Sequence, residues 1–173
     1  MKNEIVVAAA GLGALLLPRT ASAQWYSEFS PYPRSYAVDP SYPGGTNTGT
    51  ALTAAAGTWN NLFSGQGWGS NWMAPGSGDV TIQFRSDYAA FNAPGGGCAG
   101  NGTTGHLVCD PFVANQDTNY QQQMFTHEFG HMFGATDDET PYDTVMSNNP
   151  VWTNDFTGED YYCFEYYWGF EGS

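Results

Sequence analysis

The chain has 173 residues, and 17 acidic side chains outnumber 4 lysines and arginines to give a formal net charge of −13. Nucleic acid and anionic lipid would be repelled by this charge, so neither is expected as a partner, and no membrane association is expected. Its 6 tryptophans, 11 tyrosines and 11 phenylalanines argue against a disordered acidic chain, because such chains are poor in aromatic side chains. The composition therefore predicts a globular protein.

Residues 1–23 have the pattern of a secretory signal peptide. Thirteen apolar or glycine residues at 5–17 are followed by small residues at 21–23, which suit cleavage before Gln24. A helix of thirteen residues reaches only about 20 Å, too short for a hydrocarbon core of roughly 30 Å, so a membrane anchor is the weaker interpretation. We expect a single domain, residues 24–173, that is secreted and monomeric.

The spacing of apolar residues predicts the order of helices and strands. Apolar side chains spaced by 3, 4 and 3 from Leu52 indicate a helix, and strict alternation from Val80 to Phe84 indicates a half-buried strand. The glycine-rich segments 64–78 and 87–105 are expected as connections. The expected elements are strands at 35–38, 80–84 and 106–109 and helices at 50–63, at 118–134 and from about 157 onward.

The helix expected at 118–134 begins with a capping signal. Thr118 is followed three residues later by Gln121, the spacing of a capping box. Its apolar face is predicted to consist of Phe125, Phe129, Met132 and Phe133.

Three cysteines, at positions 98, 109 and 163, leave one without a partner in the chain or paired between chains. Export permits disulfides, and we favour Cys98 with Cys109, which bracket a short loop rich in glycine, asparagine and threonine. Such a closure would add about 2–3 kcal/mol of stability. The Asn101-Gly102-Thr103 sequence inside this loop is expected to form a turn.

The motif with the clearest chemistry is His127-Glu128-Phe129-Gly130-His131, inside the second expected helix. Two histidines four residues apart lie on one helical face and can bind one zinc ion. Glu128 is then beside the metal and can take a proton from water. Two polar histidines on a helix surface are the competing interpretation, because the five-residue motif also arises by chance.

The residues after the motif favour a metal site. Gly134 lies three residues after His131 and permits the left-handed conformation that ends a helix. Asp137 follows three residues later and is the preferred third ligand, with Asp138 and His106 as alternatives. His106 is otherwise expected as a polar surface group.

This pattern, HExxHxxGxxD with Met146 nine residues after Asp137, resembles the metzincin clan of zinc endopeptidases. Aspartate as third ligand is found in the snapalysin family of that clan, and the flanking regions resemble small matrixin-like domains. The resemblance implies zinc on His127, His131 and Asp137, with Glu128 as general base and then proton donor. It implies that Met146 forms a structural floor beneath the metal.

The implied fold is α+β, with a mixed twisted sheet, an active-site helix and a small C-terminal lower part that ends in a helix. Two features depart from the clan. Asn148 occupies a position where some members have tyrosine, and no cysteine is available in an N-terminal pro-segment for a cysteine switch.

We therefore expect a secreted zinc endopeptidase that acts on proteins or peptides. One alternative is a non-catalytic exported binding domain braced by zinc, and another is a hydrolase of non-protein amides. Nine acidic residues lie between Asp137 and Glu171 without a basic residue among them. They are expected to be a solvated surface, with calcium binding as a second interpretation.

Overall fold

The computed structural model describes residues 32–87, 97–135, 137, 144–147, 156 and 160. Several predictions lie outside these residues: the signal peptide at 1–23, Asp138, Asn148, Cys163 and, apart from Asp160, the final helix from 157 onward. In the part of the chain that is described, no helix is both long and apolar enough to cross a membrane.

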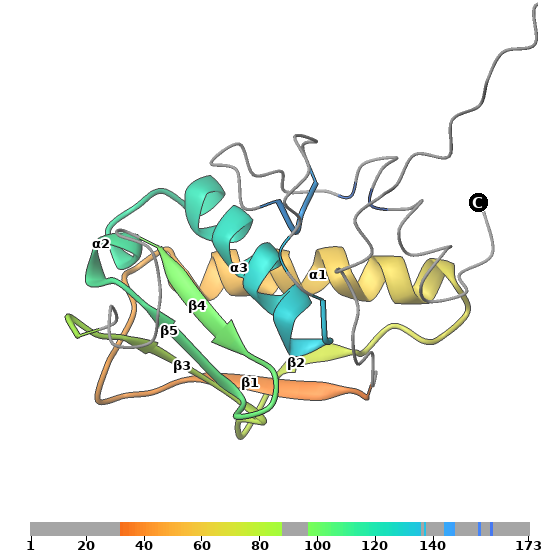
Figure 1. Ribbon diagram of the computed structural model, residues 1–173, viewed down its shortest axis with the longest axis horizontal. Coiled ribbons are helices and arrows are strands. Elements are labelled where there is room, and N and C mark those ends of the chain that lie inside the picture. Colours follow the sequence, from red (N-terminus) through yellow and green to blue (C-terminus); the bar gives the residue numbers. More distant parts are fainter. Residues whose placement is uncertain are drawn as a thin grey trace, which may run out of the picture.

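A five-stranded mixed sheet carries two long helices, so the protein is α+β. The strand order is β2-β1-β3-β5-β4, and every neighbouring pair is parallel except β4 with β5. Figure 1 shows α1 and α3 over the same face of the sheet. The elements are β1 (Arg34–Val38), α1 (Thr48–Gly65), β2 (Met73–Pro75), β3 (Val80–Phe84), β4 (Cys98–Asn101), β5 (His106–Cys109), α2 (Pro111–Ala114) and α3 (Thr118–Met132).

The predicted strands at 80–84 and 106–109 are confirmed at both ends, and the strand at 35–38 and the helices at 50–63 and 118–134 differ from the observed elements by one or two residues at an end. Two strands and one short helix were not predicted. The strand β2 depends on Asn60 of α1, whose Oδ1 accepts from the main-chain N of Trp72 at 2.7 Å and of Met73 at 2.9 Å. The prediction that 64–78 and 87–105 are only connections is therefore wrong, because contacts from distant residues hold β2 and β4 in the sheet.

The core between the sheet and the helices is aromatic. Trp59 of α1 is fully buried, and its Nε1 donates to the carbonyl of Thr126 in α3 at 2.8 Å. Its ring lies 5.2 Å from that of Phe133 and 4.8 Å from that of Phe156, centroid to centroid. Trp59 thereby joins both helices to a residue of the C-terminal segment.

The predicted apolar face of α3 is confirmed, since Phe125, Phe129, Met132 and Phe133 are all buried. Phe125 packs near Phe84 of β3, and Phe129 packs near Tyr36 of β1. This face directs α3 against the sheet and leaves its other side for polar residues.

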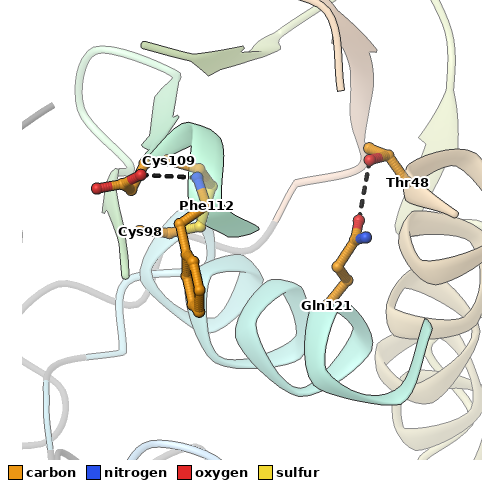
Figure 2. The surroundings of a disulfide bond; sticks show 6 residues. Thr48, Cys98, Cys109, Phe112 and Gln121 are labelled. Atoms are coloured by element: carbon orange, nitrogen blue, oxygen red, sulfur yellow. Dashed lines mark hydrogen bonds between the residues drawn. A yellow bond between two sulfur atoms is a disulfide. The ribbon is translucent and has the colours of Figure 1, made fainter. Parts of the chain in front are cut away.

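The start of α3 is capped differently from the prediction. Asp117 is the N-cap residue, and its side chain accepts from the main-chain N of Tyr120 at 2.8 Å. Gln121 is buried and accepts instead from Thr48 Oγ1 of α1 at 2.9 Å (Figure 2). The capping-box prediction is therefore wrong, because Gln121 is used to join the two helices.

The predicted disulfide between Cys98 and Cys109 is confirmed, and it joins directly opposite residues of β4 and β5 (Figure 2). Beyond it, Asn101 Oδ1 accepts from the main-chain N of Thr103 and of Thr104, both at 3.0 Å. Residues 101–104 therefore form the predicted turn, and β4 is held to β5 at both of its ends.

Candidate metal centre

The structure brings His127, His131 and Asp137 together at the C-terminal end of α3. The Nε2 atoms of the two histidines lie 3.2 and 3.3 Å from the same oxygen, Asp137 Oδ1. Their candidate ligand atoms all lie within 4.8 Å of one another, so the group could hold one metal ion. No other such group is found in the described part of the chain, and calcium binding by the acidic C-terminal segment stays an untested second interpretation.

A tight helix end returns the chain to the two histidines. Gly134 has φ = 93°, the left-handed conformation that was predicted for it. The main-chain N of Gly134 donates to His131 O at 3.1 Å, and that of Ala135 donates to Gly130 O at 3.0 Å. This reversal brings Asp137 back beside the helix it has just left.

Main-chain carbonyls orient both imidazole rings. His127 Nδ1 donates to Val145 O at 2.9 Å, and His131 Nδ1 donates to Ala135 O at 2.8 Å. A carbonyl can only accept, so each Nδ1 carries a proton. In the neutral ring Nε2 then has a lone pair for a metal, whereas in the protonated, metal-free ring Nε2 can donate to Asp137. Nε2 is the atom that points toward Asp137, and this arrangement is typical of histidines that bind metals.

The electrostatics of the group favour positive charge between the rings. Burial lowers the pKa of His131, but the hydrogen bond to Asp137 and the charge of Glu128 outweigh burial and raise it to about 9. Hydrogen bonds from His127 and then from His131 hold the pKa of Asp137 well below its usual range. The negative charge of Asp137 would also attract a divalent cation to the space between the two imidazole rings.

Glu128 is not among the three grouped residues, although it is the neighbour of His127 on α3. Its side chain is buried, and among the described residues Oε2 has no hydrogen-bond partner. A buried carboxylate oxygen without a donor is costly, and such groups concentrate at functional sites. The placement of Glu128 is therefore difficult to explain by stability alone.

Met146 is fully buried against the middle of the motif. A Cβ atom built on Gly130 would overlap the Met146 sulfur and would lie 3.1 Å from the Trp59 ring. The turn that carries Met146 is closed by a hydrogen bond of 3.1 Å from Ser147 N to Thr144 O. Met146 thus packs against α3 between the two histidine positions, and its role as a floor beneath a metal stays a prediction.

Asp160 is a residue of this site that the sequence did not single out. It is fully buried, and its Oδ1 accepts from the main-chain N of Val145 at 3.0 Å. The carbonyl of the same Val145 accepts from His127 Nδ1. A buried carboxylate therefore supports the residue that orients a predicted metal ligand, whereas the sequence placed Asp160 in a solvated acidic surface.

His106 lies on β5 and is exposed, as expected of a surface group, and it is not part of the grouped residues. Cys98 and Cys109 are used in the disulfide. Comparisons with protein-family models and with curated proteins found no match for this chain.

If His127, His131 and Asp137 bind zinc, we expect Asp160→Ala to weaken that binding by about 10-fold. This is the lower end of the effect of losing a direct partner of a metal ligand, because Asp160 acts on His127 only through Val145. Asp160→Asn retains an oxygen acceptor for the Val145 amide and is expected to keep most of the affinity. Competition with a chromophoric chelator measures both variants. Equal affinities for Asp160→Ala and the unaltered protein would contradict a role through Val145.

Proposed function

We propose that this protein is a secreted zinc endopeptidase of the metzincin type. The observation that carries the proposal is the convergence of His127 Nε2, His131 Nε2 and Asp137 Oδ1, with Glu128 next to it on the same helix. Two imidazoles and one carboxylate are suitable ligands for zinc, and three protein ligands leave one position open, as in catalytic zinc sites.

In this proposal, His127, His131 and Asp137 would hold zinc, which would act as a Lewis acid toward the peptide carbonyl and toward water. Glu128 takes a proton from the attacking water and later returns it to the amine that leaves. Val145 and Ala135 hold the two imidazoles in the tautomer that presents Nε2. Met146 packs against Gly130 of α3 and takes no part in the reaction.

The sheet supports a peptide as the substrate rather than a non-protein amide. Within the described sheet β4 is an edge strand, and it pairs with β5 alone. Gly100 of β4 packs against Glu128, so an extended peptide that pairs with this edge would lie beside the general base. An edge strand offers a row of main-chain donors and acceptors, which small amides cannot use.

The main alternative is a non-catalytic binding domain in which zinc is structural. A structural site is closed by a fourth protein ligand, for which His106, a cysteine or Asp138 would be needed. His106 lies elsewhere on β5, and Cys98 and Cys109 are bonded to each other. Among the described residues none of these candidates closes the site, which favours the catalytic proposal, whereas Asp138 and Cys163 lie outside the described residues. The disulfide is compatible with an extracellular location.

The test is a digest of casein and of a peptide library by the protein that begins at Gln24, with and without a chelator. We expect cleavage that stops when the chelator removes the metal and returns when zinc is added back. A protein that binds zinc but cleaves no member of the library would favour the binding domain instead.

A further inference from the structure

The edge strand β4 lies directly on the part of α3 that carries the motif. A Cβ atom built on Gly102, in the turn after β4, would overlap the main-chain carbonyl oxygen of His131. Two residues earlier, a Cβ atom on Gly100 would meet Glu128 and Met132. Glycines at both positions allow the strand and the helix to approach each other this closely.

The contact at Gly100 concerns the carboxylate itself. The Cβ position on Gly100 lies 2.7 Å from Glu128 Oε2, 2.9 Å from Met132 Cε and 3.1 Å from the carbonyl oxygen of Glu128. Real Cβ atoms are almost never found within 3.0 Å of another heavy atom. The Glu128 carboxylate therefore occupies space that any side chain at position 100 would take.

The strand has little freedom to move away from the helix. Cys98, two residues before Gly100, is bonded to Cys109 of β5, and Gly100 is paired opposite Leu107 of the same strand. Leu107 is fully buried in the core. A side chain at position 100 would consequently displace the Glu128 carboxylate rather than the strand.

We propose that Gly100 is a positioning residue for Glu128. This inference rests on the proposed function, because the position of the Glu128 carboxylate matters to catalysis only if Glu128 is the general base. Gly100 has no side chain that could take part in the reaction, and its contact is with the general base rather than with a metal ligand. It acts by leaving room for the Glu128 carboxylate beneath β4, and the disulfide helps by holding that strand in place.

The kinetic test uses Gly100→Ala, Glu128→Gln and the double variant. Gly100→Ala is expected to lower kcat at least tenfold, with KM within about twofold and zinc content unchanged, since misplaced catalytic groups lose rate rather than binding. In the Glu128→Gln background, Gly100→Ala should cause no further loss. A kcat within twofold of the unaltered protein, or the same loss in both backgrounds, would overturn the proposal.

A second measurement does not depend on peptidase activity. The atoms that must give way are the ends of the Glu128 and Met132 side chains, so Gly100→Ala should lower the melting temperature of the metal-free protein by about 2–4 °C, the effect of a cost of about 1 kcal/mol in a domain of this size. Glu128→Ala removes the carboxylate that overlaps the Cβ position of residue 100. In that background, Gly100→Ala should lower the melting temperature by less than half as much. Equal falls in both backgrounds would overturn the proposal even in a protein that cleaves nothing, whereas absence of cleavage alone would count against the proposed function.

Discussion

Glu128→Gln is expected to lower kcat by about 10²–10⁴-fold while zinc remains bound, because general base catalysis contributes an effect of this size. The amide has nearly the same shape as the carboxylate but cannot accept the proton of the attacking water. The three residues grouped for metal binding are unchanged in the variant. Initial rates on a fluorogenic peptide and the zinc content of the purified variant are the two measurements.

Asp117→Asn provides a matched control on the same helix. It also removes one negative charge from α3, but at the N-cap, where asparagine caps a helix about as well as aspartate. Its activity should therefore stay close to that of the unaltered protein. Full peptidase activity of Glu128→Gln with zinc bound would rule out the proposed mechanism.

The helix α3 could be predicted from sequence because its information is local. The apolar spacing that buries Phe125 and Phe129 and the spacing that pairs His127 with His131 belong to one continuous segment. Gly134 then marks the helix end, and the short distance along the chain limits which carboxylates can return to the histidines. The position of Asp137 beside both rings agrees with that reasoning, while its role as a zinc ligand stays a prediction.

The features that the sequence did not reveal depend on contacts between distant residues. The strand β2 is only three residues long and is held by Asn60, 13 residues before Met73 in the chain. Asp160 resembles the other acidic residues of its segment, and only its contact with Val145 distinguishes it. Hydrophobic periodicity carries no information about either contact.

The packing of Met146 against the His127–His131 motif can be tested with two glycines that both lie in helices. Gly57 of α1 has open space around its Cβ position, whereas the Cβ position of Gly130 in α3 overlaps the Met146 sulfur and lies 3.0 Å from its Cε. Helix propensity alone predicts that alanine stabilises both positions by roughly 0.5–1 kcal/mol. We expect this gain for Gly57→Ala and a loss of about 1–3 kcal/mol for Gly130→Ala, because overpacking a buried site has that cost.

Denaturant unfolding of the metal-free protein measures both free energies of unfolding without a contribution from zinc. Because the overlap is with one side chain, Met146→Ala should make the Gly130→Ala substitution less costly, and the double variant should show this coupling. Equal stabilisation by Gly57→Ala and Gly130→Ala would contradict the close packing of Met146 against α3. A loss that Met146→Ala does not reduce would assign the cost to Trp59 instead, whose ring is the other close neighbour of Gly130.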